Sequence, residues 1–378
     1  MRDFEMHLAR SVSLRTSWTT VIAACQGRRS TPWLAPSANT CFRWLMPSPA
    51  TVAEAMLARW PGAAGPVTRL ATGHINETWT TDAHILQRIN DHVFVAPAAL
   101  MRNLGRAVAH ESALLGHALL VSPLANAEGD AWSVDADGGI WRLFPRLPSR
   151  SFDVLPERLL AAAGRAFGTF LARFATFDAA SLETAIDGFH DLPRYLARFD
   201  ALPKGEAQAE AAAIDRLREG TTATGPATPR RAIHGDCKVN NLLFHPQRDD
   251  VTAIIDLDTL MPGDPAWDFG DLVRSTSAGN ERPSDLSFSL PRFERLARGF
   301  RATYGAIDSP SHFAAAPAYM SLMLAVRFLT DHLEGDHYFR VTRRGENLTR
   351  AQSQLALTTL FTQHQDAMTR ILEAPCQP

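Results

Sequence analysis

Six residues that are able to take part in phosphate chemistry fall within one short stretch of the chain. They are His234, Asp236, Lys238, Asn241, Asp256 and Asp258. In such a grouping, one carboxylate can orient a hydroxyl nucleophile, while an amide and a second carboxylate hold Mg²⁺ against the phosphates of a nucleotide. The residue types and their spacing therefore predict phosphoryl transfer.

The overall composition is that of a globular protein. The 378 residues are 46% hydrophobic and 21% charged, and a chain of this length can bury a sizeable core. A formal net charge of −2 provides no polybasic surface, so we do not expect nucleic acid as a partner. We find no apolar run that approaches the roughly 18 residues of a membrane span, so no membrane partner is expected.

The four cysteines, Cys25, Cys41, Cys237 and Cys376, show no spacing typical of a disulfide framework or a zinc site. Reduced thiols in a cytoplasmic protein are the simplest interpretation. The first 45 residues contain six arginines and only two acidic residues. We interpret them first as the result of a start codon assigned too early, with Met46 as the true start, and second as a transit peptide, with secretion third. In each case we expect little packed structure in residues 1–45.

Residues 46–145 are predicted to form a small, mainly antiparallel β lobe. A helix is expected from Thr51, and a second at Arg102–Leu120. Strands are expected at Val67–Ala71, Glu77–Thr81, His84–Ile89, Trp132–Val134 and Ile140–Phe144. The periodicity of this part supports one sheet with an inserted helix.

Residues 146–378 are predicted to form a larger, mainly helical lobe. Its expected helices are Pro156–Phe177, Leu192–Phe199, Glu206–Glu219, Pro291–Tyr304, Ala314–Leu333 and Leu348–Leu372. Short strands near Leu242–Phe244 and Ala253–Ile255 interrupt them, and Gly220–Pro229 is expected to be a loop. Length and periodicity alone support the class α+β.

Four stretches give the chain a resemblance to a known group of enzymes. They are GHINETW with ILQRIN (73–90), HGDCKVNNLLF (234–244), IDLDTLMPGDPAWDFGDLVR (255–274) and RFLTDHLEGDHYFRV (327–341). This pattern resembles the aminoglycoside phosphotransferase / choline kinase superfamily, and within it most closely the bacterial N-acetylhexosamine 1-kinases. The resemblance implies a two-lobed, protein-kinase-like fold that uses ATP and Mg²⁺.

The resemblance also implies roles for the central residues. Asp236 is expected to be the catalytic carboxylate that orients the attacking hydroxyl, and Lys238 to neutralise charge on the transferring phosphoryl group. Asn241 and Asp256 are expected to bind Mg²⁺, which prefers hard oxygen ligands. His234 is expected to support the loop by hydrogen bonding.

Several further residues are assigned with alternatives left open. Asp258 is either a second metal ligand or a sugar contact, and Arg274 either contacts substrate or forms a salt bridge on its helix. Asp268 and Asp271 are expected to cap the next helix and to brace the catalytic loop. In the late segment, Asp331 and Tyr338 are candidate sugar contacts, as are His332 and Asp336.

The nucleotide is expected to meet the small lobe at three places. Gly73, His74 and Asn76 form the turn that would cover the phosphates. The strand lysine of protein kinases is absent, and Gln87 or Arg88 stands in its place; we favour Arg88, with Glu111 as a possible partner. Adenine, or guanine if GTP is used, would meet the chain around Phe144 to Leu147.

We therefore expect an enzyme that transfers phosphate from ATP to a sugar hydroxyl, most plausibly the anomeric one of an N-acetylhexosamine. An amine-bearing acceptor, such as an aminoglycoside or a choline-like alcohol, is the alternative. Residues 296–378 hold eight Arg against seven Asp and Glu, which offers no acidic excess for a polycation. An inactive sugar- or nucleotide-binding module is disfavoured by the presence of Asp236, Asn241 and Asp256 together. A sulfatase lacks its Cys-x-Pro-x-Arg site, and the oligomeric state stays open.

Overall fold

The computed structural model describes residues 49–70, 75–114, 116, 118–221, 230–279 and 282–375. The chain divides into two compact units, Met1–Pro49 and Ala50–Pro378, and the second contains all the chemistry considered below. The predictions on residues 1–45, on Gly73 and His74, and on most of the 220–229 loop lie outside the described residues.

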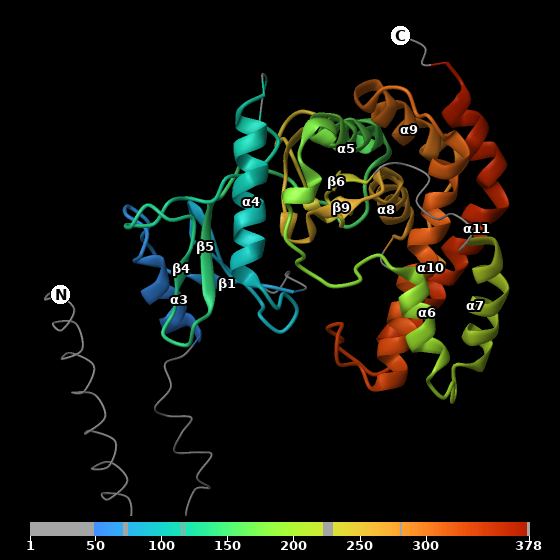
Figure 1. Cartoon of the computed structure of the whole chain (residues 1–378), viewed down its shortest axis with the longest axis horizontal. Coiled ribbons are helices and arrows are strands. Elements are labelled where there is room, and N and C mark those ends of the chain that lie inside the picture. Colours follow the sequence, from blue (N-terminus) through green and yellow to red (C-terminus); the bar gives the residue numbers. More distant parts are fainter. Residues whose placement is uncertain are drawn as a thin grey trace, which may run out of the picture. The chain divides into compact units, whose positions relative to one another are not determined.

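The smaller part of the second unit is a five-stranded antiparallel sheet with the order β1-β2-β3-β5-β4 (Figure 1). Its strands are β1 (Thr68–Arg69), β2 (Glu77–Thr80), β3 (His84–Arg88), β4 (Ser133–Val134) and β5 (Ile140–Pro145). Residues on one face, including Trp79, Leu86 and Trp141, form a core with helix α3 (Pro49–Leu57). Because side chains alternate along a strand, Gln87 and Arg142 point to the opposite face.

Helix α4 (Pro97–Ser112) lies between the sheet and the larger part. It begins about one turn before the predicted Arg102 and ends well before the predicted Leu120. Proline is tolerated in a first helical turn because its missing N–H has no partner there. Glu111 accepts the backbone N–H groups of Leu119 and Leu120 at 2.8 and 2.7 Å, which holds the following segment out of the helix.

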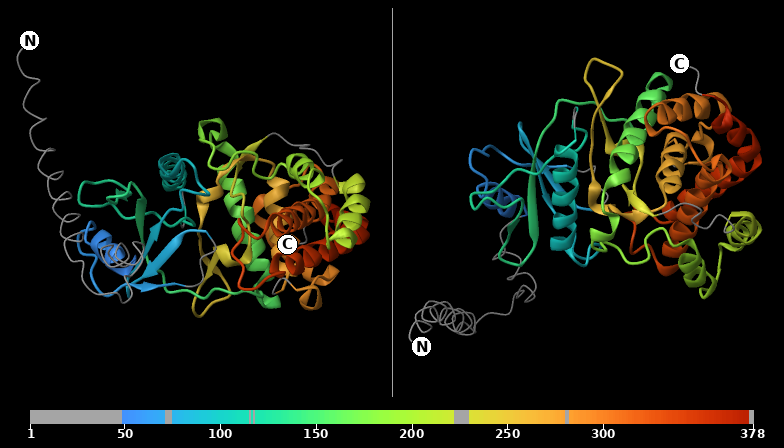
Figure 2. Two further views of the ribbon diagram at one scale, coloured as in Figure 1. Left: turned by 90° about the horizontal axis from the view of Figure 1, so that it is seen from below. Right: turned by 45° about the horizontal axis from the view of Figure 1, so that its top comes forward.

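The larger part is a bundle of helices around α10 (Pro310–Glu334), which packs along α6, α8 and α11 (Figures 1 and 2). The other helices are α5 (Leu160–Arg173), α6 (Leu192–Asp200), α7 (Gln208–Thr221), α8 (Pro265–Ser277), α9 (Leu290–Tyr304) and α11 (Glu346–Glu373). Short 3₁₀ turns lie at Glu157–Leu159, Phe174–Thr176, Ala179–Ser181, Val239–Asn241, Leu257–Thr259 and Pro283–Asp285. The predicted mixture of a small antiparallel sheet and a larger helical part is confirmed.

Helix α10 is apolar enough over 18 residues to meet the length and composition of a membrane span, which our reading of the sequence missed. In the structure, 89% of that apolar window is buried within the protein. Core helices of large domains have this character because neighbouring helices cover them on all sides. We therefore assign α10 as the central core helix.

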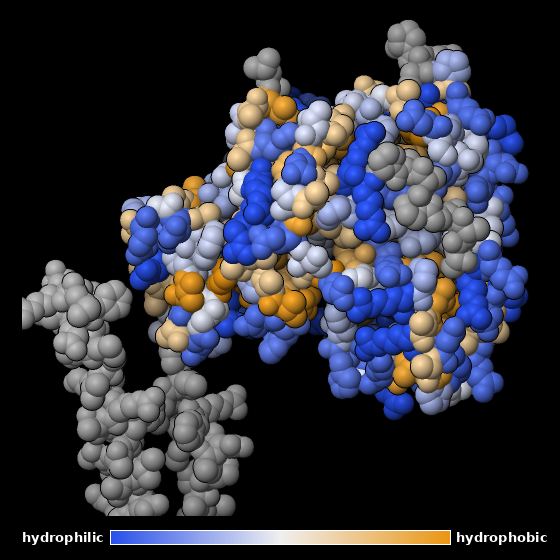
Figure 3. All heavy atoms as spheres, viewed as in Figure 1, coloured by the Kyte–Doolittle hydropathy of each residue, from blue (hydrophilic) through white to orange (hydrophobic). Residues whose placement is uncertain are grey.

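Two short antiparallel pairs position the chemistry between the helices. Strand β6 (Arg231–Ile233) pairs with β9 (Met261–Gly263), and β7 (Leu242–Phe244) pairs with β8 (Val251–Ile254). The segment after β6 and the segment after β8 are thereby brought together. Figure 3 shows hydrophobic residues scattered in small groups among hydrophilic ones on the visible face. The large hydrophobic side chains that are exposed in the described residues are Val95, Val134, Val154 and Tyr338.

Candidate active site

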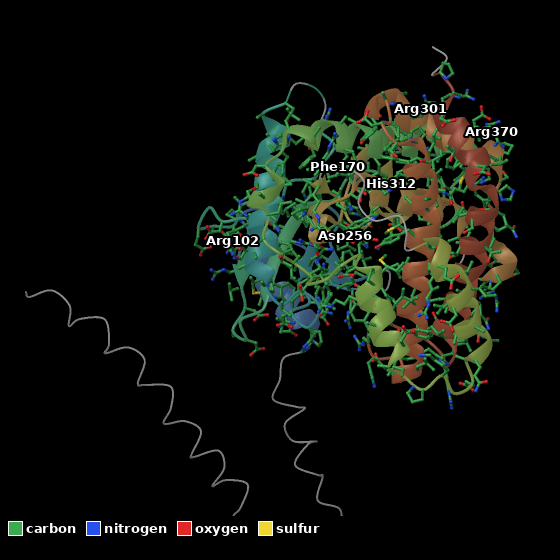
Figure 4. All side chains as sticks on the ribbon, turned by 45° about the vertical axis from the view of Figure 1, so that its right-hand side comes forward. Arg102, Phe170, Asp256, Arg301, His312 and Arg370 are labelled. Carbon is green, nitrogen blue, oxygen red and sulfur yellow. The ribbon has the colours of Figure 1, made fainter. Side chains whose placement is uncertain are left out.

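The candidate site is built from two loops, one after β6 and one after β8. Figure 4 shows Asp256, from the second loop, between the sheet-bearing part and the long helices. The first loop carries Asp236, Lys238 and Asn241, so the four residues predicted to perform catalysis and metal binding come from adjacent segments. The backbone N–H of Ile255 donates to the carbonyl oxygen of Asn241 at 3.0 Å and joins the two loops directly.

The first loop is anchored by a buried carboxylate from α8. Asp268 accepts the backbone N–H groups of His234 and Gly235 at 2.8 and 2.9 Å, as expected for a bracing residue. Burial raises the pKa of Asp268 to about 6 in spite of these bonds. The predicted helix cap is a different residue: Asp264 accepts the N–H of Ala266 at 2.9 Å, because it precedes the first turn of α8 whereas Asp268 lies inside it.

The conformation of the loop requires glycine at position 235. Gly235 has φ +79°, and a Cβ there would lie 2.5 Å from the carbonyl oxygen of Thr259. The His234 side chain is fully buried, donates from Nε2 to the carbonyl of Ile255 at 3.0 Å, and has the rings of Phe167 and Phe170 edge-on. His234 is thus a support of the loop, as expected.

Asp236 is held by the two neighbours that the sequence indicated. Lys238 Nζ lies 2.6 Å from Asp236 Oδ2, and Asn241 Nδ2 donates to the same oxygen at 3.1 Å. Burial opposes ionisation of Asp236, but the charge and hydrogen bond of Lys238 outweigh it and lower its pKa to about 2. Burial also opposes the charge on Lys238, while Asp236 and Asp256 raise the pKa of this ammonium. Both groups are therefore charged at neutral pH.

Asp256 has an unusual backbone conformation for a residue with a side chain. Its φ of 66° and ψ of 56° place it in the left-handed region. Such backbone strain is concentrated at functional positions, where the surrounding structure imposes it. Two effects raise the pKa of Asp256 to about 7: burial by the surrounding protein, which is the larger, and the negative charge of Asp258. The side chain is nevertheless open to solvent on one side.

Asp258 does not offer an open carboxylate to a metal or a sugar, which corrects both roles predicted for it. Arg142 donates to its two oxygens at 2.6 and 2.9 Å, and Asn76 Nδ2 donates to Oδ2 at 2.6 Å. Asp258 and Arg142 are 3% and 2% exposed, so this is a fully buried ion pair. It links the strand β5 to the loop after β8.

On β3, Gln87 lies on the face towards the site and Arg88 does not, which is the reverse of our expectation. Arg88 lies on the outer face and donates to Asp135 at 3.2 Å, whereas Gln87 accepts from Arg142 at 2.9 and 3.0 Å on the inner face. The predicted pair of Arg88 with Glu111 does not form, because Glu111 binds Arg173 of α5 at 2.8 Å. Because side chains alternate along a strand, Gln87 and Arg88 face opposite sides of the sheet, and the sequence did not establish which of them faces the site.

Two of the candidate substrate contacts have partners within the protein. Arg274 donates to Asp271 at 2.7 Å with both side chains buried, which is the salt bridge that the sequence left open. Asp331 accepts the backbone N–H groups of His337, Tyr338 and Phe339 and the amide of Asn347. This carboxylate shapes the loop after α10 and does not face a sugar, which corrects its predicted role.

Tyr338 belongs to a cluster that the sequence analysis missed. The guanidinium carbon of Arg327 lies 5.2 to 5.4 Å from the centres of the rings of Phe189, Tyr195, Tyr338 and Phe339. Arg327 also donates to the hydroxyl of Tyr338 at 3.3 Å. Arg327, Tyr338 and Phe339 all lie in the quoted RFLTDHLEGDHYFRV segment, which was a signal, but Phe189 and Tyr195 are distant in sequence.

His190 connects this cluster to the catalytic loop. Its Nε2 donates to the carbonyl oxygen of Gly235 at 2.7 Å, and its ring lies 4.2 Å from that of Phe189. Burial lowers the pKa of His190 to about 4, so it is neutral at physiological pH. His190 therefore links Phe189 of the Arg327 cluster to Gly235, the residue that precedes Asp236.

Phe144 and Leu147 lie where β5 ends and the chain passes into the larger part, and their contact with a base stays a prediction. The part of the chain that the structure describes contains no cluster of three His, Cys, Asp or Glu side chains suited to a metal. Metal binding by Asn241 and Asp256 stays a prediction; Mg²⁺ in nucleotide sites commonly completes its coordination with phosphate oxygens and water.

A small antiparallel sheet joined to a helical part, with paired acidic loops between them, defines a kinase-like phosphotransferase. The model of the phosphotransferase enzyme family matches residues 66–315, and the chain belongs to this family.

Solved structures with the same fold include a microcompartment-associated aminopropanol kinase (17% identity, TM-score 0.60, 84% of this chain and 98% of that one). They also include an aminoglycoside phosphotransferase from Alicyclobacillus acidocaldarius (16%, 0.58, 92% and 98%) and an amicoumacin kinase in complex with AMP-PNP, Ca²⁺ and Ami (12%, 0.53, 91% and 96%). A 123-residue stretch is 28% identical to mouse acyl-CoA dehydrogenase family member 10, over 31% of this chain. The chain spans about a tenth of the length of that relative.

Proposed function

We propose that the protein is a Mg²⁺-dependent small-molecule kinase that transfers the γ-phosphate of ATP to a sugar hydroxyl, with the anomeric hydroxyl of an N-acetylhexosamine as the leading candidate. The observation that carries this proposal is the arrangement of Asp236 with Lys238 and Asn241, facing the strained Asp256. Membership of the phosphotransferase enzyme family and the AMP-PNP named with the amicoumacin kinase support the use of ATP.

Asp236 is suited to orient the attacking hydroxyl. One of its oxygens, Oδ2, is engaged by Lys238 and Asn241, which leaves Oδ1 to accept the hydrogen bond of the acceptor. With a pKa of about 2, Asp236 is a weak base, so its contribution is chiefly positional, which a loose phosphoryl-transfer transition state permits. As the acceptor oxygen bonds to phosphorus, its proton passes to Asp236, and the bond to the departing ADP oxygen breaks.

The donors present fit a magnesium nucleotide. Asn241 and Asp256 supply an amide oxygen and a carboxylate, the hard ligands that Mg²⁺ prefers. When bound, the cation neutralises charge on the phosphates. Lys238 forms an ion pair with Asp236 and is subject to the negative charge of Asp256, so its ammonium can stabilise charge on the transferring group.

The sugar acceptor is supported by the cluster beside the catalytic loop. Arg327 with the partly exposed rings of Phe189, Tyr195 and Tyr338 offers aromatic faces and N–H donors. Such a surface suits a neutral molecule rich in oxygen and is unfavourable for a polycationic one, because a fixed guanidinium repels ammonium groups.

A panel assay of the purified full chain tests this proposal. ADP release would be followed with MgATP and, separately, GlcNAc, GalNAc, other free hexoses, choline and kanamycin. We expect turnover that depends on a free sugar and on Mg²⁺. Turnover of choline or kanamycin without turnover of any sugar would assign the amine-bearing alternative. An absence of sugar turnover together with an absence of nucleotide binding would contradict the proposed function.

A further inference from the structure

Protein kinases use a strand lysine, paired with a helix glutamate, at the phosphates of the nucleotide. The described part of the small sheet has no such pair. The position on β3 that faces the site carries Gln87, which has no charge. Helix α4 directs its buried carboxylate, Glu111, to Arg173 of α5 and away from the sheet. Among the described residues of β3 and α4, no strand cation is therefore paired with a helix carboxylate.

A buried cation is supplied by the neighbouring strand. Arg142 of β5 donates to both oxygens of Asp258 at 2.6 and 2.9 Å and twice to Gln87 at 2.9 and 3.0 Å. Its remaining contacts are the thioether of Met101 on α4 at 3.9 Å and the ring of Phe144, whose centre lies 5.2 Å from the guanidinium carbon. The guanidinium is thus occupied by protein groups on all sides, and it has no side left open for a phosphate.

Asp258 joins Arg142 to the loop that carries Asp256 and to Asn76. It follows Asp256 by two residues, within the short turn Leu257–Thr259. It also accepts from Asn76, the last residue of the expected phosphate-covering turn, whose own Oδ1 accepts the backbone N–H of Asn90 at 3.0 Å. A single carboxylate therefore fixes the metal-binding loop and the small sheet relative to each other.

We propose that Arg142 is a positioning residue of the nucleotide site, on the strand next to the one that lacks a phosphate-binding lysine. It acts through Asp258, and holds Asp256 and Asn76 where a magnesium nucleotide binds. This inference rests on the proposed function. Its physical basis is that a buried carboxylate without its partner carries a large desolvation cost, which the chain would relieve by moving the loop. A second carboxylate, Asp256, makes that cost larger.

Two other roles for Arg142 make different predictions. A direct contact with phosphate would make the effect of Arg142 independent of Asp258. If Arg142 has a purely structural role and only joins α4, the sheet and the larger part, its replacement would lower stability and leave the metal-dependent part of nucleotide binding unchanged. Arg173 provides a control for a purely structural role, because it forms another largely buried ion pair, with Glu111 at 2.8 Å, which joins α4 to α5.

The experiment is a double-mutant cycle measured by calorimetry on the full chain. Binding of MgAMP-PNP, and of adenosine without metal, would be measured for the wild type, Arg142→Met, Asp258→Asn, the double variant and Arg173→Met. We expect each single substitution at the pair to weaken MgAMP-PNP binding about ten-fold or more, with the double variant close to either single one. Adenosine binding should change about two-fold at most, and Arg173→Met should bind MgAMP-PNP as the wild type does.

Additive losses in the double variant would overturn the inference in favour of a direct phosphate contact. If the affinities for adenosine and MgAMP-PNP fell equally, or if Arg173→Met lost as much affinity for MgAMP-PNP, the inference would be overturned in favour of a purely structural role. Arg142→Lys adds a further readout, because a lysine keeps the charge but cannot make the two-point contact. It should therefore fail to restore binding. If the wild type does not bind MgAMP-PNP, the proposed function and this inference both fall, whereas the outcomes above overturn the inference alone.

Discussion

Arg142 and Asp258 are 116 positions apart in the chain, and they meet through two hydrogen bonds of 2.6 and 2.9 Å with almost no solvent exposure. The pair joins the sheet of the small part to the loop that carries Asp256. Buried ion pairs contribute little net stability when intact, but an isolated buried charge is costly.

This asymmetry gives a prediction about stability. Arg142→Met should lower the free energy of unfolding by about 3–5 kcal/mol, because it leaves the Asp258 carboxylate buried and unpaired. The double variant with Asp258→Asn should lose less than Arg142→Met alone. Denaturant unfolding followed by tryptophan fluorescence would measure both values. A double variant less stable than Arg142→Met would show that the unpaired charge is not the cause.

Replacement of Asp236 should separate chemistry from binding. Asp236→Asn keeps the shape of the side chain but removes the charge that orients the acceptor and pairs with Lys238. We expect kcat to fall about 10²–10⁴-fold while MgAMP-PNP affinity stays within a few-fold. Asp153→Asn is the matched control, because Asp153 is near the loop, accepts from exposed Asn240 at 2.9 Å, and should retain activity. Wild-type turnover in Asp236→Asn would refute the role given to this carboxylate.

The buried imidazole of His190 predicts a dependence of stability on pH. Its pKa is about 4 in the folded protein and about 6.5 in an unfolded chain, so the unfolded state binds more protons between these values. The contribution of His190 is complete above pH 6.5 and is lost as the pH falls towards 4, to a total of about 3 kcal/mol.

His190→Asn should flatten the profile between pH 6.5 and 4, because asparagine accepts the left-handed backbone at φ 65° and does not titrate. Chemical unfolding at a series of pH values would measure the slope. His92→Asn, which removes an exposed imidazole, should keep the slope of the wild type. An unchanged slope in His190→Asn would mean that other groups account for the acid sensitivity.

The loop after α10 depends on one carboxylate. Asp331→Ala leaves three backbone N–H groups without their acceptor and removes one of the two acceptors of the Asn347 amide, so we expect a loss of about 2–4 kcal/mol in the free energy of unfolding. Since Tyr338 is in this loop, the acceptor KM should rise more than the nucleotide KM.

Thermal unfolding and steady-state kinetics would measure these two effects. Glu334→Gln is a suitable control: Glu334 pairs with Arg198 at the surface, and its loss should cost about 1 kcal/mol or less. A loss in Asp331→Ala as small as that of the control would show that the loop is held by other contacts.

The catalytic loops were predictable because their information is local. Asp236, Lys238 and Asn241 lie within six residues on a loop that glycine and a short 3₁₀ turn constrain, so their spacing nearly determines their geometry. Strand and helix positions were likewise recovered from periodicity, with errors at the ends, as at α4. Arg142 is a charged residue within the apolar strand IWRLF, and this pattern could have singled it out. We did not use that signal.

The sequence by itself determined the phosphotransferase family, the loop proposed to carry the chemistry and the mixture of sheet and helices, since each depends on residues a few positions apart. Only the tertiary structure decided which face of β3 meets the site, and that Gln87 rather than Arg88 lies there. It alone brought Arg142 to Asp258, Glu111 to Arg173, and four aromatic rings to Arg327. These contacts depend on the packing of distant segments and on the phase of strand alternation, which no local pattern specifies.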